Sequence, residues 1–480
     1  LKKHPQFIND IDRGSLALYM RYCYVPAPHS IYKGIMKVEP GTIVTVTLQD
    51  SEHTTEKYWN ALDVVRTGAE SPFEGTVAEV TNDLDIALRK TISQQMMADV
   101  PLGAFLSGGI DSSAVVALMQ AQSSRPIKTF TIGFSEAGYN EAIFAKLVAE
   151  HLGTEHTELY VSSQDALNVI PKLPNLYCEP FADSSQIPTF LVSSLARHHV
   201  TVSLSGDGGD ELFCGYNRYL FADKLWKGLS MTPASIRKLV GKSIKNFPAA
   251  GWNQAFKLLN RITPRKFNGI SWGDKLQKGA GVMASKDLMS LYQQLVSNWQ
   301  DPSAVVIGEG EHDRIFSTDF QLLSDVGDIQ KMMAIDTISY LPDDILVKVD
   351  RSAMFSSLET RAPYLDQNLI NFSNILPLNL KIKNSKKKYI LSELLKKLLP
   401  SYNFNYPKKG FSIPLDHLMK NELKDFTFNL LGNDEFYKDD FLNKDEIINL
   451  FLEHQNNKKN NSHILWNLIV YFSWRQKYKI

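Results

Sequence analysis

Two segments of the chain combine glycines, hydroxyl side chains and carboxylates at spacings that suit phosphate chemistry. The first reads SGGIDSS over 107–113, between a predicted strand and a predicted helix. Glycines let backbone N–H groups approach an anion closely, and the start of a helix adds the positive end of a dipole. Asp111 would repel a phosphate unless a cation lay between them, so the segment predicts Mg²⁺ as well as phosphate. A capped helix after a glycine turn is the simpler interpretation.

The second segment reads SGDGGDE over 205–211 and directly follows a predicted strand over 200–204. Its glycines allow close approach to a ligand, and its three acids complement the first segment as carriers of a cation. By itself, such a segment is typical of an ordinary surface loop. Ligands of doubly wound sheets bind outside the carboxyl ends of the strands, so two such loops in one sheet favour a shared phosphate and Mg²⁺ site.

Two charged stretches are less specific. Residues 381–410 contain nine lysines against one acid, Glu393. Most of these lysines are expected on a solvated face, but one or two could neutralise a polyphosphate or a developing charge. The stretch around 346–365 is also dense in charge, and ion pairs on a helix surface explain it as well as a functional site does.

The elements that must position the loops follow from hydrophobic periodicity. Apolar residues spaced three to four apart predict helices, and short β-branched or apolar runs predict strands. The order of the elements predicts an α/β fold with a doubly wound, mostly parallel sheet, followed from about residue 215 by a mainly helical part. The expected helices cover 77–97, 112–122 and 140–152, and the expected strands cover 100–106, 128–134, 156–161 and 200–204.

Residues 1–60 read as a short α/β piece, with a helix over 15–22 and a strand over 42–48. About 60 residues build only a small core, so this piece is expected to lack the rest of its domain. Residues 65–75 read as a linker. The chain begins with Leu1 rather than Met, which favours an internal start or a processed or cropped chain.

Composition limits the classes of function. The 480 residues contain 52 Lys and Arg against 52 Asp and Glu, so general binding to nucleic acid or acidic lipid is not expected. We find no apolar run long enough to span a membrane. The three cysteines are far apart and form no CxxC motif, which argues against a disulfide framework and favours a reducing compartment, the cytoplasm.

The motifs together resemble those of a known family. SGGIDSS is similar to the pyrophosphate loop of the ATP pyrophosphatase superfamily. With SLSGDGGDELFCGYNRY (203–219), YLPDDILVKVDRSAM (340–354), LETRAPYLD (358–366) and KKYILSELL (387–395), it resembles glutamine-dependent asparagine synthetases over about 76–425. The resemblance implies an adenine nucleotide alpha hydrolase-like domain over 69–480. It also implies that 1–68 hold a linker and the last part of a class II glutaminase domain, an α+β remnant.

The resemblance implies a two-step ligation that uses ATP and Mg²⁺. The β-carboxylate of aspartate attacks the α-phosphorus of ATP, which gives β-aspartyl-AMP and pyrophosphate. Ammonia from glutamine then displaces AMP and gives asparagine. Aspartate, ATP and glutamine or ammonia are thus the expected partners, and a homo-oligomer stays open.

The resemblance also implies roles for particular residues. Lys388 would stabilise charge during adenylation, with Lys387 as the alternative one residue away. Asp207 lies where many members carry a glutamate that acts on ammonia. Its side chain is one methylene shorter, which leaves its reach and the substrate open. Asp111 and Asp210 would hold Mg²⁺, and the expected ATP and pyrophosphate positions are Leu106, Ser107, Gly108, Gly109, Asp111, Ser112, Ile132, Ser205 and Gly206.

One departure from the family concerns the nitrogen source. Its glutaminase uses an N-terminal cysteine, whereas residue 1 here is Leu and the earliest cysteine is Cys23. The chain is therefore expected to use ammonia, and a parent protein with the missing domain would use glutamine. Two alternatives stay open. A relative could amidate or cyclise another carboxylate, as β-lactam-forming or surface-polysaccharide enzymes do, or the chain could be a non-catalytic homologue.

Overall fold

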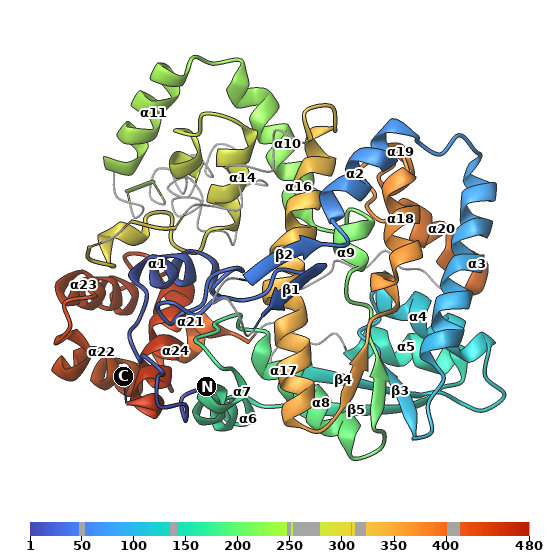
Figure 1. The fold of residues 1–480 in the computed structure, drawn as a ribbon, viewed down its shortest axis with the longest axis horizontal. Helices are drawn as coiled ribbons and strands as arrows, with labels where there is room; N and C mark the ends of the chain where they lie inside the picture. The colour runs from blue at the N-terminus through green and yellow to red at the C-terminus, as the bar shows by residue number, and fades with distance from the viewer. Residues whose placement is uncertain are drawn as a thin grey trace.

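A parallel sheet lies at the centre of the part that carries the two loops (Figure 1). The computed structural model describes residues 1–47, 53–134, 142–246, 251–252, 279–308, 310–312, 323–400 and 413–479. The sheet has five strands in the order β5-β4-β3-β6-β7, and all neighbours are parallel. The strands are β3 (Leu102–Phe105), β4 (Lys128–Phe134), β5 (Glu155–Val161), β6 (Val202–Leu204) and β7 (Glu359–Arg361).

The strand order contains a switch point between β3 and β6. The chain runs outward from β3 through β4 to β5 on one side, and it then returns to β6 and β7 on the other side. In open α/β sheets, ligands bind at such a point, outside the carboxyl ends of the strands. The loops at 107–113 and 205–211 follow β3 and β6, so the sheet brings both to this point. The predicted fold class and its strands are confirmed.

Strand β7 was missed because its three residues, Glu359–Arg361, are polar and form no apolar run. It pairs with β6 through backbone hydrogen bonds, which any residue except proline can make. A three-residue edge strand of this kind has no periodicity to detect.

Helices cover both faces of the sheet. On one face, α3, α4, α5 and α20 share a hydrophobic cluster with Ala104 of β3 and Leu204 of β6. On the other face, α8 and α17 pack with Phe130, Ile132 and Phe134 of β4. The alternating directions of strand side chains explain the two layers. These helices are α3 (Val77–Gln95), α4 (Ile110–Ala121), α5 (Ala142–Leu152), α8 (Gln186–Arg197), α17 (Val347–Phe355) and α20 (Tyr389–Leu398).

Helix α3 shows how the sequence specifies one of these elements. Thr76 and Glu79 form a reciprocal capping box at its start, which satisfies backbone N–H groups that the helix leaves free. Val80, Leu84 and Leu88 recur every four residues and are fully buried. The predicted helix over 77–97 is confirmed with an end at Gln95.

Shorter elements connect the sheet to the rest of the fold. The helix α9 (Gly209–Leu212) begins inside the second glycine-rich loop, and a π-helical turn, η4 (Leu341–Leu346), runs directly into α17. The other connecting helices are α6 (Ser163–Val169), η1 (Ile170–Lys172), α7 (Leu173–Leu176), η2 (Pro302–Ala304), η5 (Pro363–Leu365), α18 (Gln367–Ile375) and α19 (Leu378–Lys381).

The predicted helical part forms two further groups of packed helices. Helices α10 (Asn217–Ser230), α14 (Leu288–Val296) and α16 (Asp328–Ile338) share a cluster that contains Tyr219, Tyr292 and Met332. The buried carboxylate of Asp336 joins them, because it accepts hydrogen bonds from both tyrosine hydroxyls at 2.7 Å. Near them lies α11 (Ala234–Asn246). The second group contains α21 (Leu415–Lys420), α22 (Lys424–Gly432), η6 (Asp434–Tyr437), α23 (Lys444–Gln455) and α24 (Ser462–Tyr478).

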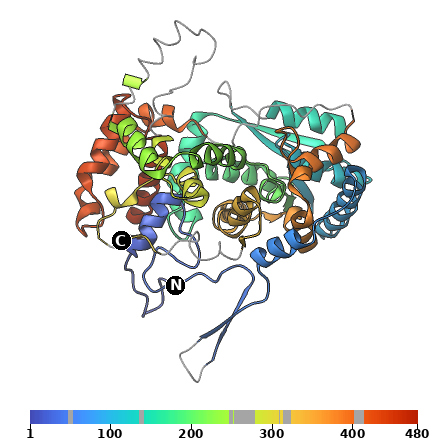
Figure 2. The same ribbon diagram turned by 90° about the horizontal axis from the view of Figure 1, so that it is seen from above.

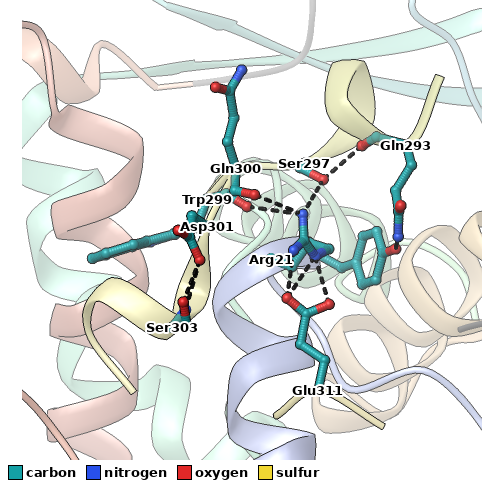
Figure 3. Close-up of polar contacts among 9 residues, drawn as sticks. Arg21, Gln293, Ser297, Trp299, Gln300, Asp301, Ser303 and Glu311 are labelled. Carbon is teal, nitrogen blue, oxygen red and sulfur yellow. Dashed lines mark hydrogen bonds and ion pairs between the residues drawn. The ribbon is translucent and has the colours of Figure 1, made fainter. Parts of the chain in front are cut away.

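The N-terminal helix α1 (Arg13–Tyr22) packs against this second group, next to α24. Figure 3 shows how Arg21 ties α1 to the segment that follows α14. Its guanidinium pairs with Glu311 at 2.9 Å and 3.0 Å through Nε, and Nη1 donates to Ser297 at 3.1 Å and to Gln300 O at 3.2 Å. The predicted helix over 15–22 is confirmed.

The domain boundary expected between residues 68 and 69 stays a prediction.

The predicted linker over 65–75 is wrong in its first half, because 65–70 belong to α2 (Ala61–Glu70). Leu62 and Val65 of this helix are buried against Leu323 and Val326. Gly68 lies so close to α18 that a Cβ there would stand 2.5 Å from Asn374 O. The segment 65–75 looked like a linker partly because it contains Gly68, but this glycine allows α2 to pack closely against α18.

A two-stranded antiparallel hairpin precedes α2 and projects from the body of the molecule (Figure 2). It consists of β1 (Thr42–Val46) and β2 (His53–Lys57), whose side chains are largely exposed. The predicted strand over 42–48 is confirmed as far as Val46. No helix in the described parts of the chain is both long and apolar enough to cross a membrane.

Candidate active site

The two glycine-rich loops touch one another at the switch point of the sheet. A Cβ on Gly206 would stand 2.8 Å from the backbone nitrogen of Ser112, and one on Gly209 would stand 2.5 Å from Asp111 Oδ1. Such distances are shorter than a carbon atom tolerates, so the contact requires glycine at both positions. The glycines of the second loop therefore let its backbone lie directly against the first loop.

The first loop leaves the start of α4 open. Gly108 has a φ of +75°, and a Cβ there would stand 2.6 Å from the backbone of Phe144. Ser107 and Ser112 hold the loop together, with their hydroxyl oxygens 3.0 Å apart. Gly109 is the N-cap residue of α4 and has no side chain that could accept a hydrogen bond from the first turn. The carboxylate of Asp111 does not supply this capping hydrogen bond either. The helix start thus keeps N–H groups for an anion, which the simpler capped-helix interpretation does not explain.

The ammonium group of Lys388 lies between the carboxylates of the two loops. Its Nζ pairs with Asp111 Oδ2 and lies 2.6 Å from Asp210 Oδ1. Burial works against the charge of Lys388, but the two carboxylates outweigh it and hold the pKa of the lysine above its usual value. The site therefore contains a buried lysine whose positive charge is stabilised by the two carboxylates.

The backbone separates Lys388 from its neighbour Lys387. Lys388 adopts a left-handed conformation with a φ of 52° directly before α20. Lys387 Nζ donates instead to the carbonyl oxygen of Gly215 at 2.5 Å. Of the two adjacent lysines, the structure brings Lys388 to the carboxylates of Asp111 and Asp210.

The other lysines of the 381–410 cluster divide into surface and buried groups. Lys396 and Lys397 are exposed and pair with Glu393 and Asp85. Lys381 is buried, and burial lowers the pKa of its amine to about 8. Lys408 and Lys409 lie outside the described residues.

Asp207 lies in the second loop beside a cavity of about 300 Å³. Burial raises the pKa of its carboxyl group; Ser205 and Lys348 lower it, whereas Asp111 and Asp210 raise it further. The cavity opens at the carboxyl ends of β6 and β7. It is lined by Gln95, Ser205, Asp207, Leu346, Val349, Asp350, Thr360, Arg361, Ala362, Leu365 and Asp366.

Two sequence-predicted positions are apolar and fully buried. Leu106 directly follows β3, and Ile132 lies in the middle of β4; each side chain is 1% exposed. Leu106 faces the layer of α3 and α4, whereas Ile132 faces the layer of α8. Both side chains therefore lie in the hydrophobic layers between the sheet and its helices, and their contact with a nucleotide stays a prediction.

The structure adds three charged residues that the loops did not indicate. Lys348 Nζ lies 2.7 Å from Asp183 Oδ2, and Asp344 is hydrogen-bonded to Asp183. Asp344 belongs to η4 and Lys348 to α17. Lys348 lies within the charged stretch 346–365, and Asp344 lies just before it. Surface ion pairs explain this stretch from sequence alone, but the pair of Lys348 and Asp183 is buried. Asp183 carried no signal, because its partner is 165 residues away.

The carboxylates of Asp111 and Asp210 suit a divalent cation. Among the residues that the structure describes, no three His, Cys, Asp or Glu side chains are grouped to hold a metal ion. However, Mg²⁺ is commonly bound by one or two carboxylates together with phosphate oxygens and water. Asp111 Oδ1 is buried and accepts no hydrogen bond within the described chain, and a cationic group already lies between the two acids. The residues present therefore fit the ion.

Loops of this kind at the switch point of a parallel sheet define a class of α/β proteins that bind nucleotides. Within that class, a sequence model of the asparagine synthase family matches residues 83–476. The chain belongs to the asparagine synthase family, and it is accordingly an enzyme of the ligase class that forms carbon–nitrogen bonds. The family expected from the motifs is confirmed.

Individual relatives cover most of the chain. It is 31% identical over 466 residues to asparagine synthetase [glutamine-hydrolyzing] 1 of Bacillus subtilis, with 97% of this chain and 69% of the relative aligned. Asparagine synthetase [glutamine-hydrolyzing] 3 of the same organism is 24% identical, with 85% of this chain and 59% of the relative aligned. Amidase chyE of Penicillium rubens is 23% identical, with 80% and 59% aligned.

Proposed function

We propose that this protein converts aspartate to asparagine with ATP, through a β-aspartyl-AMP intermediate. The observation that carries the proposal is the position of Lys388, whose ammonium group lies between Asp111 and Asp210 where the two loops meet. Names of the relatives support the product: two are asparagine synthetases.

The loops would bind the triphosphate and the nucleoside. Backbone N–H groups of the SGGIDSS loop and the start of α4 would hold the pyrophosphate, with Ser107, Gly108, Gly109 and Ser112 around it. Ser205 and Gly206 would lie against the nucleotide at the end of β6, with Leu106 and Ile132 below it. When the β-carboxylate of aspartate attacks the α-phosphorus, negative charge moves onto the departing pyrophosphate. Lys388 would stabilise this charge, because a buried cation is most effective where charge develops away from water.

Asp111 and Asp210 would hold Mg²⁺ together with phosphate oxygens. When bound, the ion supplies neutralisation of the pyrophosphate charge. Lys388 must then turn from the carboxylates toward the phosphates, which leaves room between the acids. In the second step ammonia attacks the β-carbonyl carbon, AMP departs with the bonding electron pair, and Asp207 would accept a proton from the new amide nitrogen.

For a polypeptide of residues 1–480 we expect ammonia as the nitrogen donor. Cysteine thiols act as nucleophiles only when ionised. Burial raises the pKa of Cys23 far above its usual value and that of Cys214 to about 12. Neither thiol is thus suited to attack glutamine, and a glutaminase domain in a longer parent would supply ammonia. We also propose that a domain boundary lies between residues 68 and 69. A cytoplasmic location and assembly into a homo-oligomer belong to the same proposal.

A second candidate is amidation of another carboxylate. Asp207 is one methylene shorter than glutamate, so it leaves additional room beside the cavity of about 300 Å³. A relative named as an amidase also aligns over 80% of this chain. The β-lactam-forming and surface-polysaccharide reactions belong to this alternative.

The experiment measures exchange of radiolabelled pyrophosphate into ATP with Mg²⁺ across a panel of amino acids and other carboxylates. Exchange that depends on aspartate, followed by asparagine formation with ammonium, supports the proposal. Efficient turnover with glutamine would contradict the ammonia requirement of this polypeptide. Exchange with a different carboxylate, but not with aspartate, would favour the second candidate.

A further inference from the structure

Helix α11 reverses the usual arrangement of a surface helix. It packs on the segment before α14 through the buried Arg237, which donates to Ser285 O at 2.8 Å and to Thr232 O at 3.0 Å. Its second inward position is Gly241, where a Cβ would stand 2.9 Å from Ala280 O. In most surface helices the inward face carries the large apolar residues. In α11 that face carries an arginine and a glycine instead.

The aliphatic residues of α11 face solvent. Ile236, Leu239 and Val240 are 50%, 67% and 42% exposed. Their spacing of three and four residues places them on one face of the helix, and together they form the outer stripe of α11. Met231, three residues before α11 begins, is also largely exposed. Figure 1 shows α11 at the edge of the molecule, away from the parallel sheet. A contiguous exposed apolar stripe of this kind marks an interaction surface.

Cations lie beside the outer stripe. Lys238 and Lys242 are exposed and one helical turn apart. Neither lysine forms an ion pair with another residue in the described ranges of the chain. No Asp or Glu occurs over 224–246, whereas the same residues include Lys224, Lys227, Arg237, Lys238, Lys242 and Lys245. Acids and bases balance over the whole chain, so this positive charge is a local feature of α11 and the residues before it.

An anionic lipid surface suits both the outer stripe and the lysines. Its hydrocarbon region accepts aliphatic side chains, and its phosphates attract ammonium groups, which lysines present at the end of long flexible stems. A stable protein interface instead involves about 20–30 residues on each side and a complementary shape. Three side chains on one helix are too few for such an interface. A membrane surface requires no complementary shape, so the charge and the stripe together favour lipid.

We propose that α11 attaches this protein reversibly to an anionic lipid surface. The outer stripe would insert below the headgroups, with Lys238 and Lys242 at the phosphates. A single short amphipathic helix gives weak attachment, because stable anchoring takes more than one signal. The protein would therefore distribute between water and the membrane surface. The inference goes beyond the proposed function, and α11 contributes no residue to the candidate active site, so lipid binding and catalysis are separable.

The experiment measures sedimentation of the 480-residue protein with two kinds of vesicle, phosphatidylcholine alone and phosphatidylcholine mixed with phosphatidylglycerol. We expect at least about ten-fold stronger binding to the anionic vesicles, since each lysine near an anionic surface strengthens the attraction. Salt at about 1 M should remove most of this difference, because it shortens the Debye length to about 3 Å. Equal binding to both kinds of vesicle, or binding to neither, would overturn the inference.

Two double variants test the stripe and the charge separately. Ile236→Ser with Leu239→Ser removes most of the outer stripe and keeps the lysines. Lys238→Glu with Lys242→Glu reverses the charge and keeps the stripe. Each double variant should lose at least about ten-fold in binding to the anionic vesicles, because insertion and electrostatic attraction both contribute. Wild-type binding by either double variant would overturn the inference.

Matched controls change the same residue types at other exposed positions. Leu452→Ser in α23 and Lys396→Glu in α20 alter side chains that are 47% and 59% exposed, and both should keep wild-type binding. Losses in these controls as large as in the α11 variants would overturn the inference. All variants should show wild-type pyrophosphate exchange without vesicles. Protein that binds anionic vesicles but shows no aspartate-dependent exchange would overturn only the proposed function.

Other partners of α11 give different results. If a second copy of the chain covered the outer stripe, gel filtration would show a dimer that the double serine variant dissociates, and vesicle binding would be absent. If nucleic acid were the partner, a single-stranded oligonucleotide would bind in preference to the vesicles. Its binding would depend on the lysines and not on the outer stripe. Either result would overturn the assignment to lipid.

Discussion

Gly215 passes so close to Lys388 that a Cβ at residue 215 would stand 2.2 Å from Cε of the lysine. The same atom would stand 1.8 Å from Asp210 Oδ1. The pair of Lys388 and Asp210 therefore exists only because residue 215 has no side chain. A glycine six residues beyond the second loop's own glycines thus controls the geometry of the charged centre.

Gly215→Ala should consequently displace Lys388 from the two carboxylates. We expect pyrophosphate exchange to fall by about 10²-fold, the usual effect of losing a group aimed at developing charge. The matched control is Gly228→Ala in α10, where a Cβ meets nothing within 4 Å. This control should keep full exchange and be slightly more stable, by about 0.5–1 kcal/mol, because alanine favours helices. Normal exchange by Gly215→Ala would contradict the packing argument.

Lys388→Ala and Lys388→Arg should both lose pyrophosphate exchange at saturating ATP. Arginine does not replace the lysine, because its wide planar group differs from a compact ammonium. Lys383→Ala, Lys396→Ala and Lys397→Ala should retain it. Lys387→Ala tests the neighbouring position, and its hydrogen bond to Gly215 O predicts a smaller loss than that of Lys388→Ala. An inactive Lys387→Ala with an active Lys388→Ala would move the catalytic role by one residue.

Asp111→Asn and Asp210→Asn should each abolish adenylation at limiting Mg²⁺. Each variant removes a carboxylate on one of the two opposed loops, and with it a ligand of the ion. Titration of exchange activity with Mg²⁺ should show a higher requirement in both variants than in the wild type. If both variants keep normal exchange at limiting Mg²⁺, the metal assignment is wrong.

Arg21→Met should strongly lower the temperature of thermal unfolding. The variant leaves Glu311 without its guanidinium partner in a position where its side chain is 11% exposed. Removing one partner of a buried pair costs about 3–5 kcal/mol. Arg66→Met provides the matched control, since Arg66 pairs with Asp63 on the surface of α2. Exposed pairs contribute about 0–1 kcal/mol, so equal losses for both variants would contradict the clamp at Arg21.

The Asp343 carboxyl group should give stability a measurable pH dependence. Burial raises its pKa to about 6, although it accepts a hydrogen bond from Ala27 N at 3.0 Å. The folded state then binds more protons than the unfolded state above the ordinary pKa of aspartic acid and up to about pH 6, so the free energy of unfolding falls as pH rises through this window. Asp343→Asn keeps the acceptor and removes the titration. Urea unfolding measured from pH 4 to 8 gives the free energy of unfolding of both proteins. The difference between Asp343→Asn and the wild type should shift in favour of the variant as pH rises to about 6. The same pH dependence in both proteins would contradict the assignment.

Local sequence was sufficient for most of the sheet and for both loops. Strands β3, β4 and β6 are short runs rich in apolar or β-branched residues, and α3 carries its own capping box and apolar repeat. The glycines and acids of the two loops indicated a phosphate and cation site. Close approach of the backbone to an anion and binding of a cation by carboxylates depend on residue type, so both can be predicted from sequence. The parallel direction of the strands followed from the alternation of strands and helices, which predicts a doubly wound sheet, whereas the order β5-β4-β3-β6-β7 is known only from the structure.

The tertiary structure decided which charges meet. Lys387 and Lys388 are neighbours in sequence, but the left-handed backbone at Lys388 and the space above Gly215 direct only the latter to Asp111 and Asp210. Lys348 and Asp183 are 165 residues apart, and neither has a local pattern that names its partner. Periodicity and turn preferences arise between chain neighbours and can be read from sequence. Buried ion pairs depend on the packing of distant elements, because only the folded chain removes water from around them.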